Sequence, residues 1–155
     1  MTITVKSNLK GLTGLHAKLK GEGFGRDPVL TALSRAMMYE RTYMEMRTKR
    51  GKGKNERAFA NNEYSDSYRK KREKLGKPVD VVDLTWDNKM LKSMQASGKK
   101  RNQGLWEGKI NIAPSEVKKA KAAIADGREF FGLSKKQYKR IKQDVDKELK
   151  PDGRR

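Results

Sequence analysis

The sequence predicts an α+β fold in which helices pack on a small, mainly antiparallel sheet, with a long basic arm or loop. Three observations favour this class: a β-branched alternating segment at the N-terminus, two long amphipathic helical patterns, and two alternating segments separated by a polar turn. A chain of 155 residues suits one domain, which we place at 1–155 with the extended basic arm at about 48–78.

The N-terminal segment predicts a short strand followed by a weak helix. Residues 2–6 alternate apolar and polar positions, so Ile3 and Val5 should face inward. Asn8 is placed to cap a helix over 9–19, in which leucines recur at intervals of three and four. Two internal glycines each cost about 1 kcal/mol relative to alanine, so this helix needs tertiary support. The glycine-rich residues 21–25 end it as a loop.

The next helix should run from Asp27 to about Arg47. Asp27 is a good N-cap, and Pro28 suits the first helical position because its missing N–H costs nothing there. One face is apolar, formed by Val29, Leu30, Leu33, Ala36, Met37 and Met44. Glu40 interrupts this face. We expect an edge residue paired with a nearby Lys or Arg, the alternative being a salt bridge across a subunit contact.

The apolar rhythm stops between 48 and 77, where eleven bases stand against four acids. This composition predicts an extended arm or long loop that becomes ordered on a partner. The partner-contacting or DNA-contacting residues that we assign to it are Lys49, Arg50, Lys52, Lys54, Arg57, Arg69, Lys70, Lys71, Arg72 and Lys74. An extended segment of valines and Leu84 then ends the arm.

The C-terminal half predicts a short helix, a hairpin and two further helices. Met90, Leu91 and Met94 form one apolar patch, and residues 94–99 and 105–112 flank a turn at 100–104. Residues 115–126 are typical of a helix, ended by Gly127. Ser134 and Gln137 form a capping box for the last helix. We expect that helix to reach the core through Tyr138, Ile141, Val145 and Leu149, with a staple between Leu133 and Tyr138.

Charge and composition favour a binding or structural role. Lys and Arg number 38 against 19 Asp and Glu, a net charge of +19 that favours polyanions or acidic partners. Leu, Ile, Val and Phe make up only 28 of 155 residues, so we expect a small core completed by neighbouring subunits. The sequence has no Cys and no apolar run typical of a membrane span or signal peptide. We therefore expect a soluble protein made in the cytosol, without membrane contact.

Catalytic sites are poorly supported by the residues available. His16 is the single histidine, so we interpret it as an ordinary surface or interfacial residue. Asp80, Asp83 and Asp87 could gather around Mg²⁺ in a nuclease, but their spacing is better explained by solvated turn or cap residues. The glycines at 21–25 and 51–53 lack the phosphate-binding motifs. We expect no enzyme activity, no cofactor and no metal.

The basic arm leaves three interpretations open. Its Lys and Arg residues, interleaved with Tyr64 and Tyr68, could bind nucleic acid without sequence preference. A loop that docks on acidic protein, or a merely solvated loop, would have the same composition. Nothing places these bases on a recognition helix, so sequence-specific reading of DNA is not expected.

Two runs of sequence resemble the tail-completion or neck proteins of long-tailed bacteriophages, of the phage virion morphogenesis type. The first comprises residues 64–70 (YSDSYRK), followed by 82–85 (VDLT) and 90–94 (MLKSM). The second is 128–134 (REFFGLS), which precedes the last helix. The order and spacing of the predicted elements are similar to that family across most of the chain.

This resemblance implies a structural virion protein of the head-tail junction. The resemblance implies that such a protein forms a six-fold ring, which joins the head connector to the tail after assembly in the host cytoplasm. Its partners would be further copies of itself, the adjacent phage connector and tail proteins, and non-specifically the packaged DNA. The resemblance implies that Arg128, Phe130 and Phe131 anchor the last helix. The full set of expected anchors is Leu84, Met90, Leu91, Arg128, Phe130, Phe131 and Leu133.

Overall fold

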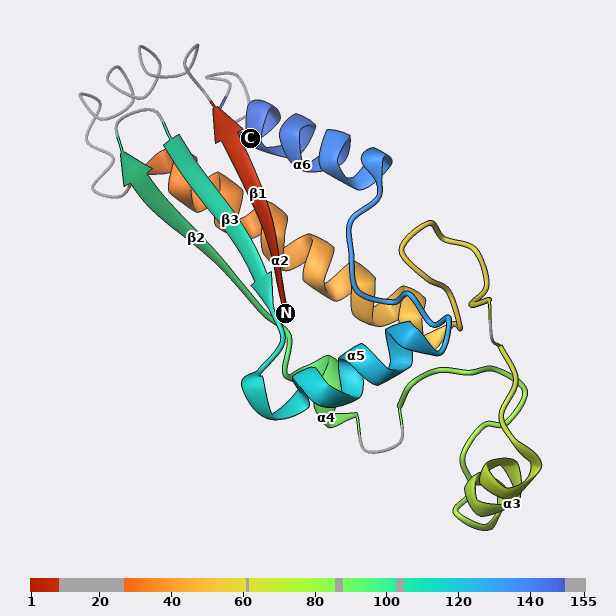
Figure 1. Ribbon diagram of the computed structural model, residues 1–155. Helices are drawn as coiled ribbons and strands as arrows, with labels where there is room; N and C mark the ends of the chain where they lie inside the picture. The colour runs from red at the N-terminus through yellow and green to blue at the C-terminus, as the bar shows by residue number, and fades with distance from the viewer. Residues whose placement is uncertain (9–26, 61, 86–87, 103–104, 150–155) are drawn as a thin grey trace. The chain divides into compact units, whose positions relative to one another are not determined.

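The computed structural model describes residues 1–8, 27–60, 62–85, 88–102 and 105–149 (Figure 1). Five helices and a three-stranded antiparallel sheet make up its regular structure, which confirms the predicted α+β class. The helix predicted over 9–19, the loop at 21–25, His16 and Asp87 lie outside the described residues.

The sheet has the order β1-β3-β2, with β1 at Thr2–Asn8, β2 at Gln95–Asn102 and β3 at Leu105–Asn111. Strand β3 is central, and its Ile110 lies opposite Ile3 on one side and Ala96 on the other. The predicted N-terminal strand and hairpin are therefore confirmed. Strand β2 extends three residues further toward the turn than expected, β3 ends one residue earlier, and β2 has an irregularity between Lys100 and Asn102.

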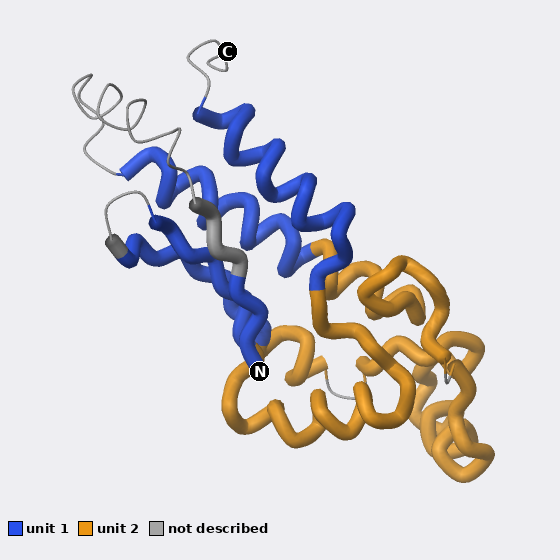
Figure 2. The backbone as a smooth tube through the Cα atoms, turned by 45° about the horizontal axis from the view of Figure 1, so that its top comes forward, with its two compact units in different colours: residues 1–42, 94–111, 133–155 blue, residues 43–93, 112–132 orange. Residues whose placement is uncertain are grey.

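The described chain divides into two compact units, coloured separately in Figure 2, where the sequence predicts one domain. Unit 1 comprises residues 1–42, 94–111 and 133–155, and unit 2 comprises 43–93 and 112–132. Unit 1 therefore contains the whole sheet. Unit 2 contains the whole of the predicted arm, which begins in the last residues of helix α2 (Pro28–Lys49); that helix contributes residues to both units.

Helix α2 begins as the sequence predicts. The carboxylate of Asp27 accepts a hydrogen bond from the backbone N–H of Leu30 at 3.1 Å and another from the indole N–H of Trp106 at 3.0 Å. The N-cap residue thereby ties the start of the helix to strand β3. Within unit 1, the predicted apolar face is buried at Val29, Leu33, Ala36 and Met37.

The contact between α2 and the sheet is close because β3 has a glycine where the helix crosses it. A Cβ atom on Gly108 would lie 2.7 Å from Cγ and 2.8 Å from Sδ of Met37, and 3.2 Å from Cδ1 of Leu33. Any larger residue would push these side chains out of their places. The missing side chain at Gly108 is thus a packing requirement of unit 1.

Gly108→Ala is expected to lower the free energy of unfolding by about 1–3 kcal/mol, the usual cost of overpacking a core. Chemical denaturation followed by circular dichroism would measure it. Adding Met37→Ala removes the atoms that the new methyl group meets, so the double variant should lose less than the sum of the two single losses. Strictly additive losses would show that the close approach does not constrain position 108.

Helix α6 (Lys135–Glu148) has the predicted capping box. The Ser134 hydroxyl accepts from the N–H of Gln137 at 3.3 Å, and the Gln137 side chain accepts from the N–H of Ser134 at 2.8 Å. Ile141, Val145 and Leu149 are buried as expected, but Tyr138 is 42% exposed. The prediction that Tyr138 reaches the core is wrong. Gln137 is buried in its place, because Gln137, Ile141 and Val145 follow one another at intervals of four residues and so lie on one face of the helix.

Glu40 explains why a polar Gln137 is buried. The Glu40 carboxylate, 1% exposed, accepts from Arg140 at 2.6 and 2.8 Å and from the Gln137 side-chain amide at 3.0 Å. The predicted pairing with a base is confirmed, although Glu40 lies in the interior rather than at an edge. These bonds join α6 to α2 within unit 1, and the two helices lie side by side in Figures 1 and 2.

Unit 2 consists mostly of short elements. Besides the end of α2 it contains α3 (Asp66–Lys74), α4 (Lys89–Lys92), a 3₁₀ turn η2 (Pro114–Glu116) and α5 (Val117–Ala125). The predicted short helix at Met90 corresponds to α4, and the predicted helix at 115–126 corresponds to η2 followed by α5. Gly127 ends α5 with φ of 78°, the left-handed conformation that the sequence predicts for it.

The predicted arm is folded against the rest of unit 2. Arg47, 3% exposed, donates to the carbonyls of Lys54 at 3.0 Å, Phe130 at 3.0 Å and Gly132 at 2.7 Å. The backbone N–H of Lys54 also donates to the carbonyl of Glu129 at 2.8 Å. The expectation of one extended arm at 48–78 therefore does not hold, because a buried guanidinium fastens its first part and α3 forms in its second.

Candidate partner-binding site

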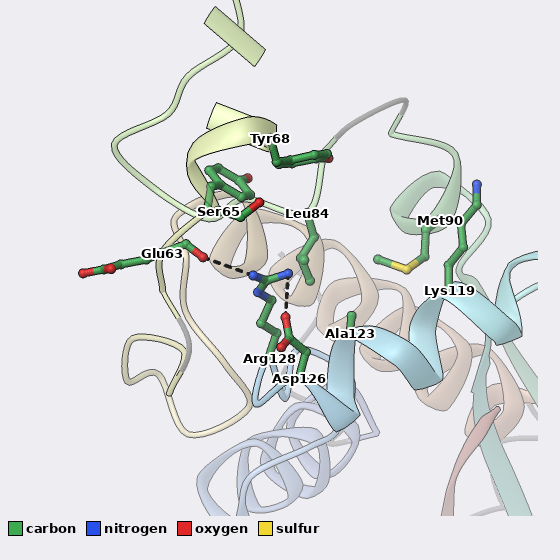
Figure 3. A pocket seen from close by; sticks show the side chains of 10 residues that line it. Glu63, Ser65, Tyr68, Leu84, Met90, Lys119, Ala123, Asp126 and Arg128 are labelled. Carbon is green, nitrogen blue, oxygen red and sulfur yellow. Dashed lines mark hydrogen bonds and ion pairs between the residues drawn. The ribbon is translucent and has the colours of Figure 1, made fainter. Parts of the chain in front are cut away.

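The two runs of sequence singled out above meet at one pocket in unit 2. The pocket has a volume of about 710 Å³, and Figure 3 shows the side chains around it. The first run contributes Tyr64, Ser65, Tyr68, Leu84 and Met90, and the second contributes Arg128. Glu63, Lys119, Ala123 and Asp126 complete the lining. Residues more than 60 positions apart in the sequence thus form one concave surface.

A buried ion pair supports the wall that carries Tyr64. Arg72, 1% exposed, donates through Nη2 to both carboxylate oxygens of Asp83 at 3.1 Å, and through Nε to the carbonyl of Pro78 at 2.8 Å. The Tyr64 hydroxyl donates to the same carboxylate at 3.1 Å and accepts from the backbone N–H of Asp83 at 3.1 Å. Asp83 therefore joins α3, the Tyr64 segment and the segment before α4.

This ion pair corrects two of the sequence predictions. Arg72 was expected among the partner-contacting bases, but it is buried and cannot meet a phosphate or a partner surface. Asp83 was expected to be a solvated turn residue, but it is only 7% exposed. A charge inside a protein needs a partner of opposite sign, and each of these two residues supplies it for the other.

The Asp83 carboxylate also fixes an unusual backbone conformation at Leu84. It accepts from the N–H of Thr85 at 3.0 Å and from the Thr85 hydroxyl, which closes a turn around Leu84. Leu84 has φ of 52°, a left-handed conformation that costs a non-glycine residue about 1–2 kcal/mol. Figure 3 shows its side chain directed toward Arg128. The local strain places an apolar side chain at the pocket.

The surroundings of Asp83 determine its ionisation. Burial raises the pKa of the carboxyl, but the hydrogen bonds from Thr85 and the charge of Arg72 outweigh this effect and hold the pKa below its ordinary value of 3.8. The charged form is therefore favoured by folding. Its contribution to stability is present at neutral pH and is lost as the pH falls through the lowered pKa.

Tyr64 should ionise only at high pH, because burial raises its pKa from 10.0 to about 12. The neutral phenol is favoured in the folded state, so this stabilisation is complete below pH 10 and is lost as the pH rises toward 12. Tyr64 is therefore expected to titrate in a late phase of the absorbance at 295 nm, near pH 12. Tyr64→Phe should remove that phase, with circular dichroism recorded to show that the fold persists. Absence of a late phase near pH 12 in the folded protein would contradict this assignment.

Aromatic rings and guanidinium groups form the polar side of the pocket. The ring centroids of Tyr64 and Tyr68 are 5.2 Å apart. The guanidinium of Arg72 lies 4.7 Å from the Tyr64 centroid, and that of Arg128 lies 6.0 Å from it. These are cation–π distances, and they hold the Tyr64 ring in place while the less buried Tyr68 ring lines the opening.

Arg128 links the two sides of the pocket, as the dashed lines of Figure 3 show. Its Nη1 pairs with Asp126 at 3.0 Å, and its Nη2 donates to the carbonyl of Glu63 at 3.2 Å. The resemblance implied that Arg128 anchors the last helix. These two partners both belong to unit 2, so Arg128 instead fastens the segment before α3 to the end of α5.

The other expected anchors occupy different depths. Leu91 and Phe130 are fully buried, and Met90 and Phe131 are buried to more than nine-tenths. The rings of Phe130 and Phe131 have centroids 6.1 Å apart. Leu84 and Leu133 are half-buried. Phe130 and Phe131 thus contribute to the interior of unit 2, the default role that aromatic residues have in a core.

Most of the predicted contact bases are exposed. They are Lys49, Arg50, Lys52, Arg57, Arg69, Lys70, Lys71 and Lys74. Lys49 pairs with Glu45 at 2.9 Å, and the half-buried Lys54 pairs with Glu129 at 2.8 Å. Four of the exposed bases lie on α3, so this helix presents a positive surface to solvent. Half of the exposed contact bases thus lie on one short helix, and the other half lie between residues 49 and 57.

The charges that line the pocket itself are balanced. Lys119 and Arg128 are matched by Glu63 and Asp126, and Lys119 pairs with Glu116 at 3.1 Å. The remaining lining is mostly apolar or aromatic, from Leu84, Met90, Ala123, Tyr64 and Tyr68, with one hydroxyl from Ser65. A neutral pocket of this composition suits an apolar or aromatic group with polar neighbours, such as a side chain of a protein partner.

Reasoning from sequence missed the roles of three arginines. Arg47 and Arg140 were not assigned a role, and Arg72 was assigned to the exposed contact residues although it is buried. A signal exists for the first, because Arg47 and Glu40 both continue the apolar face of α2 at spacings of three and four. A charged residue within such a face predicts a buried polar network. Arg72 and Arg140 have no comparable signal, since both lie among other bases.

Within the described ranges, no group of three Asp, Glu or His residues is placed to hold a metal ion. Nor is any helix there long and apolar enough to cross a membrane. Comparison of the chain with protein-family models, with curated proteins and with solved structures finds no match.

Proposed function

We propose that this protein is a structural component of a bacteriophage virion, located in the neck or tail-completion region. There it would form a ring, six-fold by analogy with the family that it resembles, which joins the head connector to the tail. The observation that carries the proposal is the pocket. The two runs that resemble the neck proteins come from distant parts of the sequence, and together they line a single surface with a rigid, ion-paired support.

The distribution of apolar residues supports a role in assembly. Several large apolar side chains are exposed, namely Met38 at 60%, Tyr39 at 79%, Met46 at 47%, Leu75 at 56% and Tyr138 at 42%. Single exposed apolar residues are common on monomers, but here they accompany a sequence with few apolar residues in total. Burial of such side chains between subunits would add to a core that one chain supplies only in part.

Composition analysis of purified particles tests the proposal. In the phage that encodes this chain, mass spectrometry of gradient-purified virions should detect the protein at a copy number that fits one ring. Particles assembled without it should accumulate as separate heads and tails in electron micrographs. Absence of the protein from purified virions would refute the proposed function.

A second candidate function is binding of nucleic acid without sequence preference. The observation that favours it is the exposed positive surface of α3, formed by Arg69, Lys70, Lys71 and Lys74. If four phosphates were neutralised, log affinity for duplex DNA would fall against log salt with a slope of about −3.6. Lys70→Gln with Lys74→Gln should then reduce the slope by about 2, with Lys142→Gln on α6 as the control. Binding with no dependence on salt or on these lysines would exclude this function.

A further inference from the structure

Helix α2 presents a pair of large apolar side chains that nothing in the described part of unit 1 covers. Met38 is 60% exposed and Tyr39 is 79% exposed. Arg35 and Thr42 lie on the same side of the helix, at three- and four-residue spacing, and are also exposed. We call these four residues the α2 face. It combines an apolar centre with a positive charge, since Arg35 remains 69% exposed although it pairs with Glu148.

The pocket in unit 2 is the complementary surface. Its lining is apolar or aromatic at Leu84, Met90 and Tyr68, and its volume of about 710 Å³ can admit a large side chain such as that of tyrosine. Two exposed carboxylates, Glu63 and Asp126, belong to the same lining, and Asp126 is already paired with Arg128. In a chain with only 19 acids among 155 residues, the exposed Glu63 carboxylate favours a positively charged neighbour.

We propose that a second copy of this chain inserts Met38 and Tyr39 into this pocket, with Arg35 of that copy directed toward Glu63. This inference rests on the proposed function in one respect, namely that the protein assembles with itself. The two surfaces are different parts of the chain, so each copy offers one and receives the other. An interface of this kind is heterologous, and it generates a closed ring when the rotation between copies closes.

The same features disfavour a nucleic acid as the occupant. The pocket lining carries as much negative as positive charge, so it offers a phosphate backbone no net electrostatic attraction. A nucleotide base could stack on the ring of Tyr68. The exposed lysines and arginines that could hold the nucleic-acid backbone, however, lie on α3 and do not line the pocket. A protein side chain with a positive neighbour fits both the apolar lining and the carboxylates.

The absence of cysteine from the sequence permits a clean test by cross-linking. Thr42→Cys places one thiol on the α2 face without altering Met38 or Tyr39, and Ser65→Cys places one thiol at the pocket. The two full-length variants are purified separately, mixed in high salt and treated with a short bis-maleimide. Covalent dimers should form in the mixture and should be at least about tenfold less abundant in either variant alone.

A second substitution tests the role of the tyrosine. Tyr39→Ser in the Thr42→Cys protein should reduce cross-linking at least about tenfold, the effect of removing the side chain that anchors an interface. Tyr138→Ser is the matched control, because it removes an exposed tyrosine of unit 1 that lies outside the α2 face, and it should leave the yield unchanged. Equal losses from both substitutions would overturn the assignment of Tyr39.

Two other results would overturn the inference. Self-cross-linking of Thr42→Cys would indicate a symmetric contact between two α2 faces, and a mixture that forms no dimers would show that the surfaces do not meet. Neither result bears on whether the protein is present in virions. Conversely, cross-linking of a protein that is absent from virions would support the interface and refute the proposed location.

Discussion

Arg72→Met is expected to lower the free energy of unfolding of unit 2 by about 3–5 kcal/mol, the usual cost of breaking a buried ion pair from one side. The substitution leaves the Asp83 carboxylate buried with bonds only from Tyr64 and Thr85. It also removes the donor to the carbonyl of Pro78 and the cation that lies over the Tyr64 ring. Chemical denaturation with a probe in unit 2 would measure this loss.

A double-mutant cycle separates the ion pair from the shape of the side chains. Asp83→Asn alone should also destabilise, because Arg72 then keeps its charge without a counterion. The double variant should recover part of the summed losses, by roughly 1–3 kcal/mol, since neither charge remains buried. Arg69→Met, an exposed position on the same helix, is the control and should change stability by less than about 0.5 kcal/mol. If Arg72→Met and Arg69→Met have the same effect, the pair does not support the pocket.

The same cycle has a signature in acid. Because the pKa of Asp83 is lowered in the folded protein, the wild-type chain should lose the contribution of the carboxylate as the pH falls below about 4. Asp83→Asn has no group that titrates there, so its remaining stability should depend less on pH in this range. Equal acid sensitivity in both proteins would mean that other carboxylates dominate acid unfolding.

Arg47→Met is expected to have the second large effect, also about 3–5 kcal/mol. The guanidinium donates to three backbone carbonyls, and each buried carbonyl left without a donor costs about 1–3 kcal/mol. Because Arg47 holds the first part of the basic segment against Phe130 and Gly132, that segment should also become accessible. Hydrogen exchange at 52–60 should quicken together with the loss of stability.

Arg50→Met provides the control for Arg47, since Arg50 lies nearby and is exposed. It should leave both the unfolding free energy and the exchange rates near those of the wild type. Unchanged exchange at 52–60 in Arg47→Met would show that other contacts fasten this segment. In that case the buried guanidinium would contribute to stability without holding residues 52–60 in place.

Local signals in the sequence were sufficient for several elements. Asp27-Pro28 predicts the start of α2, Ser134 with Gln137 predicts the capping box of α6, and Gly127 predicts the end of α5. Each of these depends on residues within about four positions of one another, where backbone hydrogen bonding and helical spacing decide the structure. The hairpin of β2 and β3 was predictable for the same reason.

The remainder depends on partners that are distant in the sequence. Arg72 meets Asp83 eleven positions away, and Arg47 meets carbonyls more than 80 positions away, so nothing local distinguishes these arginines from solvated ones. Glu40 and Gln137, 97 positions apart in the sequence, are hydrogen-bonded to each other in the interior. Because Gln137 faces the interior, Tyr138 lies on the surface and not in the core as predicted. In a chain so rich in Lys and Arg, the few buried arginines are hidden among many exposed ones.

Part of the candidate site could also be foreseen. The resemblance singled out residues at 64–70, 82–85, 90–94 and 128–134. Each of these four runs contributes at least one residue to the pocket lining, and 82–85 also contributes to the ion pair that supports it. No sequence pattern indicated that the carboxylates of Glu63 and Asp126 or the amine of Lys119 would line the pocket. The basic segment was predicted to be an arm because of its charge density. Charge density alone does not show that a buried arginine fastens such a segment to the rest of the fold.

Self-association against strong repulsion is the central physical claim. Two copies with a charge of +19 each and centres about 30 Å apart would repel by about 50 kcal/mol in salt-free water. Sedimentation velocity of the purified chain tests the claim most directly, from about 0.1 M to about 1 M potassium chloride, over which the Debye length shortens from about 10 Å to about 3 Å. The assembled fraction is predicted to rise with salt toward one closed oligomer, in contrast to binding of DNA, which salt weakens. A chain that stays monomeric over this whole range, at concentrations well above those of an assembling virion, would contradict it.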